Sequence, residues 1–165
     1  MRPVLTRIDR WLARYRPDYY AHLQIGVDGV ALDAFESRFA LRLPAAFREL
    51  YKWRNGQPPD YTERLLGNWT FEPLGEVSDR KEMLDGLVGY DFEDPRYWRR
   101  GWVPFLHDGG GSHLCVDLAA EDGGTPGQLI EFWKADEDRP VISRSIEAWL
   151  SALADSMERG TLKVL

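Results

Sequence analysis

The chain has 165 residues, of which 44% are hydrophobic, 13% aromatic and 29% charged. This length suits one domain, and the apolar content is enough for a core, which excludes a disordered chain. The formal net charge is −6, from 27 acidic and 21 basic residues. Because nucleic-acid backbones are bound by lysine and arginine, we expect no direct nucleic-acid binding. We predict a single domain over residues 1–165 whose partner is basic or neutral.

The composition also bears on location. Residues 1–17 carry charges throughout and lack the apolar run of a signal peptide, and no segment approaches the ~20 apolar residues of a membrane span. The one cysteine, Cys115, has no partner for an internal disulfide, and a free thiol is typical of a reducing compartment. These features predict a cytoplasmic protein that does not insert into a membrane.

The first third of the chain has the periodicity of three helices. Apolar residues recur at helical spacing from Val4 to Tyr15, and Pro17 ends this pattern. A second helix is predicted over residues 31–39, with Asp28 as its cap. A third follows at residues 44–54, before the breaker sequence NGQPP. The short connection between the last two predicts a helical hairpin.

The next segments are extended or irregular. WTFEPLGEV, residues 69–77, is a candidate strand in which Pro73 favours an edge or a bulge. Ser78 is predicted to cap a short helix. The inner side of that helix is predicted to carry Met83, Leu84, Leu87 and Val88. Residues 89–101, rich in acids, arginines and aromatics without a period, are predicted to form a long loop.

The rest of the chain predicts a small sheet and a closing helix. Strand-like runs at 102–106, 112–118 and 128–133 are separated by short glycine-bearing loops, which favour antiparallel hairpins over parallel crossovers. A short extended piece follows within 135–143, and a helix is predicted from Ser145 to a stop at Gly160. Helices, then strands, then a helix indicate the α+β class.

One segment gathers several reactive side-chain types: FLHDGGGSHLCVDL, residues 105–118. Phosphate-binding and dinucleotide-binding loops lead into a helix, and the former needs a lysine, but this segment leads into a strand and has no lysine. A nucleophile elbow needs a second glycine where Leu114 stands. Ser112 and His113 are neighbours on a strand, so their side chains point to opposite faces and do not pair as nucleophile and base. Whether His107 approaches Ser112 across the hairpin stays open.

A metal site is the remaining chemical interpretation of this segment. The candidate ligands are His107, Asp108, His113 and Cys115. Their spacing matches no zinc pattern, and a buried cysteine beside a hydrogen-bonded histidine is the simpler interpretation. Strand alternation places His113, Cys115 and Asp117 on one face and the leucines and valine between them on the other. We predict no catalytic, cofactor or metal site, and hence a protein that is not an enzyme.

The glycines themselves predict a structural turn. Gly109, Gly110 and Gly111 stand between two strand-like runs. Glycine adopts positive φ without a Cβ penalty, so these residues let the chain reverse sharply.

Five segments in a fixed order carry a family resemblance. They are ALDAFESRFALRLPAAFRELYKWRNGQ (31–57), EPLGEV (72–77), WVPFLHDGGGSHLCVDL (102–118), GQLIEFW (127–133) and SIEAWL (145–150). Together they resemble the SUKH superfamily, specifically its Smi/Knr-type domains, over about residues 23–153. The chain departs from the pattern at Lys134, where the family often has a histidine after the tryptophan.

The resemblance implies an α+β fold with a twisted, mainly antiparallel sheet flanked by helices. In bacteria such domains mostly serve as immunity proteins that bind a cognate polymorphic toxin, and in fungi a related domain is a regulatory adaptor of cell-wall assembly. The family has no shared catalytic triad, so no active site is carried over.

The leading functional hypothesis is an immunity protein. It would neutralise a toxin acting in the cytoplasm, such as a nuclease, by stoichiometric occlusion of the active site or substrate cleft. An acidic inhibitor is steered towards the basic cleft of such a toxin. The alternative is a non-catalytic regulatory or scaffold module that binds another protein. The sequence leaves the oligomeric state open.

The candidate contact residues are acids that flank aromatics in two loops. They are Tyr90, Asp91, Phe92, Glu93, Asp94, Tyr97 and Trp98, followed by Asp136, Glu137 and Asp138. Buried aromatic anchors often carry most of the energy of an interface, while surrounding charges set rate and specificity. The competing interpretation is that Tyr97 and Trp98 only cover the sheet.

Overall fold

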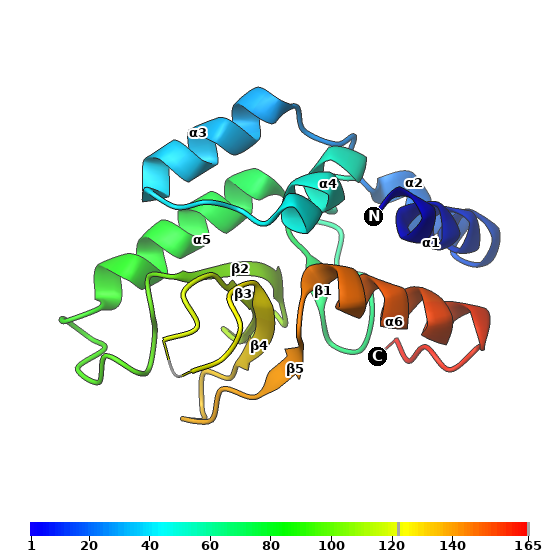
Figure 1. Ribbon diagram of the computed structural model, residues 1–165. Helices are drawn as coiled ribbons and strands as arrows, with labels where there is room; N and C mark the ends of the chain where they lie inside the picture. The colour runs from blue at the N-terminus through cyan, green and yellow to red at the C-terminus, as the bar shows by residue number, and fades with distance from the viewer. Residues whose placement is uncertain (122, 165) are drawn as a thin grey trace.

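The computed structural model describes residues 1–121 and 123–164, which form six helices and one five-stranded antiparallel sheet (Figure 1). The helices are α1 (Arg2–Tyr15), α2 (Pro17–His22), α3 (Gly29–Phe39), α4 (Ala45–Trp53), α5 (Leu74–Leu87) and α6 (Ile146–Glu158). The strands are β1 (Thr70–Phe71), β2 (Trp102–His107), β3 (His113–Asp117), β4 (Gln128–Phe132) and β5 (Val141–Ser143). They lie in the sheet in chain order, which confirms the predicted α+β class and the antiparallel meander.

The two faces of the sheet belong to separate apolar clusters. On β3, Leu114 and Val116 pack into the main core with residues of α1, α4 and α6, whereas Cys115 packs on the opposite face. That second cluster contains Leu84 of α5 and Trp98. All five residues of β3 are buried because both faces are covered, and the predicted alternation is confirmed. Figure 1 shows α1, α2 and α6 on one side of the molecule and α3 with α5 on the other.

The turn after α4 is held by side-chain hydrogen bonds to α2, to the loop that follows and to the start of α5. The Gln57 side chain accepts from the Tyr19 hydroxyl at 2.9 Å and donates to the carbonyl of Tyr61 at 2.6 Å. Asn55 Oδ1 accepts from the Leu74 N–H at the start of α5 at 2.8 Å. Since a buried amide without partners costs free energy, these contacts fix the direction of the chain between α4 and α5.

The prediction of a short helix capped by Ser78 is wrong. Helix α5 begins at Leu74, directly after Pro73, and spans 14 residues. Proline disfavours helical backbone in the residue before it but suits a helix start, so Pro73 marks the start of α5. Met83, expected on the inner side, is 52% exposed, while Leu84 is buried as expected. Ser78 instead accepts from Arg38 Nη1 of α3 at 2.7 Å.

Helix α2 is absent from the sequence prediction. Pro17 ends α1 as predicted, but it also stands at the first position of a second helix, where proline lacks only an N–H that would have no partner.

Among the described residues, no helix is both long and apolar enough to cross a membrane.

Replacing Gly56 with alanine is expected to lower the free energy of unfolding by about 3 kcal/mol or more. Gly56 has φ of +66°, and a Cβ there would lie 2.4 Å from the backbone carbonyl carbon of Glu72. Gly67 also has positive φ (+50°), but a Cβ there meets nothing within 4 Å. Gly67→Ala therefore isolates the backbone cost and is expected to lose only about 1 kcal/mol. Urea unfolding measures both, and equal losses would contradict the close approach.

Candidate partner-binding surface

The two loops named from the sequence meet in the structure. Residues 88–101 connect α5 to β2, and residues 133–140 connect β4 to β5. The Tyr97 hydroxyl donates to the Lys134 carbonyl, and Arg139 Nη2 donates to the Tyr97 carbonyl at 3.1 Å. The Arg139 guanidinium also lies 4.5 Å from the ring centre of Phe132. These contacts join both loops into one surface, called here the loop surface.

A buried ion pair holds the first loop at both ends. Lys81 Nζ, on α5, donates to Asp85 Oδ2 at 2.9 Å, to the Arg100 carbonyl at 2.6 Å and to the Trp102 carbonyl at 3.2 Å. Asp85 Oδ1 accepts from Trp98 Nε1 at 2.9 Å. Lys81 is fully buried, and burial lowers its pKa while Asp85 opposes that shift. An ammonium group has three donors, so all of them are satisfied here.

The aromatic residues of the loop surface divide into buried and accessible ones. Trp98 is fully buried, with its ring perpendicular to those of Trp102 and Phe132 at centroid distances of 5.5 and 5.2 Å. It therefore supports the loop from beneath and offers no area to a partner. Phe92 and Tyr97 are half-buried and pack against each other, and Tyr90 is 79% exposed.

The acidic residues are all exposed. They are Asp91, Glu93, Asp94, Asp136, Glu137 and Asp138. Asp94 pairs with Arg96 at 2.8 Å, and hydrogen bonds from Arg96 lower the pKa of Asp94 to about 2. The carboxylates of Glu137 and Asp138 make no ion pair with any residue that the structure describes. Both line a hollow of about 440 Å³ between the two loops, together with Asp94, Arg96, Tyr97 and Arg139.

A buried polar cluster, which sequence reasoning did not identify, lies beside β1. Glu72 Oε1 accepts from Arg80 Nε at 2.8 Å and Nη2 at 2.7 Å. His107 Nδ1 accepts from the Gly109 N–H at 3.1 Å, so the neutral ring carries its proton on Nε2, 4.0 Å from Glu72 Oε1. His113 Nδ1 and Glu72 Oε2 are buried and have no hydrogen-bond partner in the part of the chain that the structure describes.

Burial controls the charges in this cluster. It lowers the pKa of His113 to about 3 and that of His107 to about 4, in both cases assisted by the Arg80 charge. Burial raises the pKa of Glu72, while its hydrogen bond from Arg80 acts in the opposite direction. Both histidines are therefore neutral near pH 7.

The glycine turn between β2 and β3 is shaped by Asp108. Its carboxylate accepts from the N–H groups of Gly110 at 2.7 Å and Ser112 at 2.9 Å. Gly109 and Gly111 have φ of +82° and +101°. These bonds lower the pKa of Asp108 against the effect of burial. The aspartate thus holds the turn that glycine permits.

The described residues assemble no nucleophile with a base in this segment. The Ser112 hydroxyl oxygen accepts from the Lys134 N–H at 3.4 Å and has no hydrogen bond with His107. Cys115 is buried, and burial raises the pKa of its thiol well above the usual range, which makes it unreactive. Within 1–121 and 123–164, no three His, Cys, Asp or Glu residues are grouped so as to hold a metal ion.

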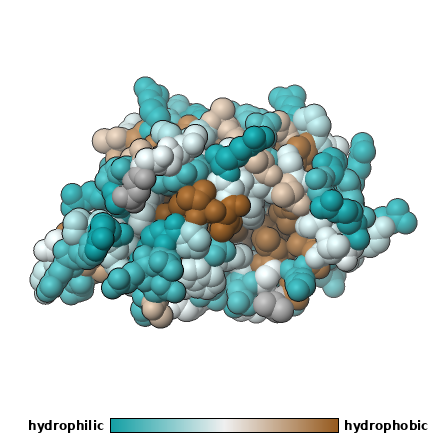
Figure 2. Space-filling model, turned by 60° about the horizontal axis from the view of Figure 1, so that its bottom comes forward, coloured by the Kyte–Doolittle hydropathy of each residue, from teal (hydrophilic) through white to brown (hydrophobic). Residues whose placement is uncertain are grey.

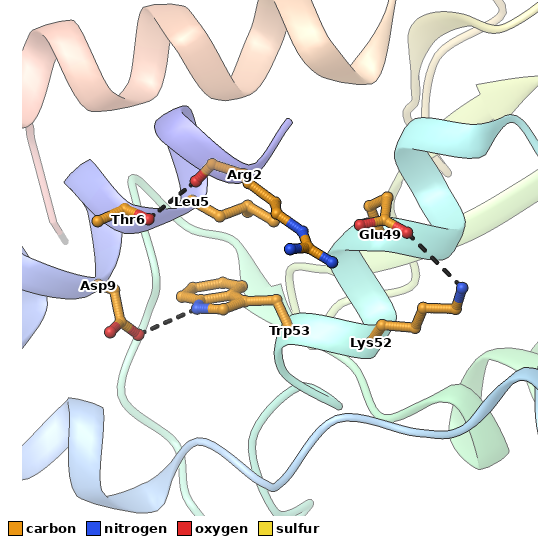
Figure 3. A pocket seen from close by; sticks show the side chains of 7 residues that line it. All are labelled: Arg2, Leu5, Thr6, Asp9, Glu49, Lys52 and Trp53. Carbon is orange, nitrogen blue, oxygen red and sulfur yellow. Dashed lines mark hydrogen bonds and ion pairs between the residues drawn. The ribbon is translucent and has the colours of Figure 1, made fainter.

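A second hollow, of about 400 Å³, lies between α1 and α4 (Figure 3). Trp53 forms its floor and donates from Nε1 to Asp9 Oδ1 at 3.0 Å. Arg2 points across the opening from α1 towards Glu49 and Lys52 of α4 (Figure 3). Opposite charges alternate around this rim, so it favours no one class of ligand by charge.

Comparisons with known proteins identify relatives. The model of the SMI1/KNR4 family (SUKH-1) matches residues 26–152. A Schizosaccharomyces pombe protein named "Cell wall biosynthesis/cell cycle regulator smi1" is 26% identical over 93% of this chain and 35% of its own length. The Saccharomyces cerevisiae "Cell wall assembly regulator SMI1" is 32% identical over 59% of this chain and 18% of its own. A Neurospora crassa "Glucan synthesis regulatory protein" is 34% identical over 39% and 12%. The chain thus spans about a third or less of the length of these relatives.

The low pKa of His113 predicts a loss of stability in mild acid. The unfolded chain binds a proton at His113 near pH 6.5, whereas the folded chain does so only near pH 3. The stability that this difference contributes is complete above pH 6.5 and is lost as the pH falls. Between pH 6.5 and 4.5 the loss from His113 is about 2 kcal/mol, partly offset by Glu72, whose raised pKa has the opposite effect.

Urea unfolding at pH 7 and pH 4.5 measures this loss. The His113→Leu variant is expected to lose less stability than the native chain over this interval, and exposed His22→Leu is expected to match the native chain. An unchanged pH dependence in His113→Leu would contradict the assignment.

Proposed function

Because the chain belongs to the SMI1/KNR4 family (SUKH-1), we propose that it is a regulatory module that acts by binding another protein and not by catalysis. The three relatives described above are named as regulators of cell-wall or glucan synthesis. One observation carries the proposal: two loops from separate parts of the chain, each with three acidic residues, are joined into one anchored surface.

Anchoring favours binding because less conformational entropy is lost when the partner arrives. The Lys81 and Trp98 contacts hold the loop before any partner is present. Tyr90 offers a large exposed ring, and Phe92 and Tyr97 offer half-buried rings that pack against each other. Such aromatic groups supply contact area, and the acids around them select the partner.

The proposed partner presents a basic surface. The chain has a net charge of −6. Glu137 and Asp138, which form no ion pair with a described residue, line the hollow between the loops. Charge of this kind speeds the encounter with a basic protein and weakens as salt is added. We place this encounter in the cytoplasm, since the single cysteine is a buried thiol.

Neutralisation of a toxin is a narrower form of the same proposal. The exposed carboxylates of the loop surface would face a basic substrate cleft, as in a nuclease. The names of the relatives support the broader regulatory role instead, since two describe cell-wall regulators and the third a regulatory protein of glucan synthesis.

Charge reversal in the second loop tests the proposal. A protein captured on the purified chain from cells of the source organism is purified in turn, and its affinity is measured by calorimetry. The variant Glu137→Lys/Asp138→Lys is expected to bind it about tenfold more weakly or worse. The control Asp18→Lys/Asp60→Lys changes the net charge equally at exposed sites in α2 and the turn after α4, and it is expected to keep the native affinity.

Equal affinity in the loop variant and the native chain would overturn the proposal. The identity of the captured protein distinguishes the regulatory form of the proposal from the immunity form. A protein whose expression kills cells, and which co-expression of this chain renders harmless, establishes the immunity form, and any other partner establishes the regulatory form.

A further inference from the structure

Strand β5 forms an open edge of the sheet. It pairs with β4 and, among the described residues, with no other strand. Its apolar side chains face solvent, with Val141 56% and Ile142 41% exposed. Figure 2, which brings the lower side of the molecule forward, shows hydrophobic side chains gathered at the middle of that face among hydrophilic ones. An unpaired edge with exposed apolar residues is a template for another extended chain.

The opposite edge of the sheet, β1, is closed. Thr70 and Phe71 are both buried. The Gln57 N–H donates to the Phe71 carbonyl at 3.0 Å, and the Phe71 N–H donates to Gln57 Oε1 at 3.4 Å. The outer edge of β1 is therefore already hydrogen-bonded to Gln57. Of the two edge strands, β5 is the one that is open to another chain.

The open edge is continuous with the loop surface. Residues 136–138 precede β5 by two residues, and the Pro140 carbonyl accepts from the Glu131 N–H at 3.0 Å, which ties this connection to β4. The strip from Asp136 to Ser143 thus has an acidic end and an apolar end. A complementary segment has basic residues at one end and apolar residues at the other.

Pairing of β5 with the β5 strand of a second copy of this chain is unfavourable. In the antiparallel pairing of β5 with itself that is centred between Val141 and Ile142, Arg144 of each copy falls opposite Arg139 of the other. Like charges that face each other across strands are destabilising. Pro140 and the register shift between β4 and β5 also interrupt a regular edge, as in proteins that avoid self-association.

We propose that β5 accepts an extended segment of the partner as an added antiparallel strand, with apolar residues beside Val141 and Ile142 and lysine or arginine beside Asp136, Glu137 and Asp138. This inference rests on the proposed function and specifies how the loop surface recognises its partner. Main-chain hydrogen bonds to the edge supply affinity, and the side chains set the direction. Antiparallel pairing matches the rest of the sheet and is slightly the more stable arrangement.

Two peptides of equal composition test the inference. VTVTKRK places its basic end at the C-terminus, where antiparallel pairing brings it beside the acidic end of the strip, and KRKTVTV is its reverse. Both are titrated into the ¹⁵N-labelled full chain and followed by NMR. VTVTKRK is expected to shift the amide signals of residues 136–143 and to bind about tenfold more tightly than KRKTVTV.

Exposed positions provide matched variants. Val141→Ser/Ile142→Ser removes the apolar contact and is expected to weaken the binding of VTVTKRK about tenfold. Ile25→Ser/Val30→Ser makes the same change at exposed apolar residues near α3 and is expected to leave it unchanged. Equal binding of the two peptides, shifts confined to other elements, or a native dimer that Val141→Ser/Ile142→Ser dissociates would each overturn the inference.

The affinity of the captured partner for the two variants tests this inference separately from the proposed function. If Glu137→Lys/Asp138→Lys weakens binding of the captured partner but Val141→Ser/Ile142→Ser does not, the proposed role of the loop surface is supported and the proposal of an added strand is wrong. If neither variant weakens binding of the captured partner, the proposed function is wrong as well.

Discussion

The ammonium group of Lys81 is removed from water completely and is compensated by three oxygens, one from Asp85 and two from the backbone carbonyls of Arg100 and Trp102. An uncompensated buried charge is strongly destabilising, so the chain must bring these oxygens to Lys81 when it folds. Asp85 belongs to α5, and the two carbonyls lie where the loop returns to β2. The charge therefore fixes the distance between the two ends of loop 88–101. Asp85, which pairs with Lys81, also accepts a hydrogen bond from Trp98, so the same ion pair positions the ring that supports the centre of the loop.

The position of the loop surface follows from that constraint. Trp98 fills the space between Trp102 and Phe132 on one face of the sheet. The loop above it then presents Tyr97 to Lys134 and Arg139, which draws the second loop alongside. Acids and aromatics that lie about forty residues apart in the chain become neighbours. A surface held in this way needs no ordering step before the proposed binding of a partner. It continues to the open edge of β5.

Much of the fold could be predicted from local patterns. The periodicity of α1, the Asp28 cap, the start of α6 at Ser145 and the glycine-bearing hairpins each follow from neighbouring residues, and the structure has them. The start of α5 could not be placed because Pro73 suits an edge strand as well as a helix start. Lys81 lies in a charged stretch, SDRKE, that is typical of a solvated helix face. Its partners include backbone carbonyls of a distant loop, which no side-chain pattern reveals.

The candidate site was predictable only in part, for the same reason. Composition identified both loops but not their contact through Tyr97 and Arg139. It left open whether Trp98 faces a partner or covers the sheet, and in the structure Trp98 is buried. The cluster of Glu72, Arg80 and the two histidines arises because β1 lies beside β2, although more than thirty residues separate Thr70 and His107 in the chain. A role in partner binding for the loop residues remains a prediction.

Hydrogen exchange of the partner-free chain tests the central claim, that the buried Lys81 charge holds the loop surface in place before binding. The amides of Phe92 and Trp102, which donate to the carbonyls of Leu87 and Arg99, are predicted to be protected in the native chain. In the Lys81→Met variant they are predicted to exchange about tenfold faster or more, while the amide of Val116 in the central strand stays protected. Rapid exchange of the loop amides in the native chain, or unchanged protection in Lys81→Met, would contradict the account.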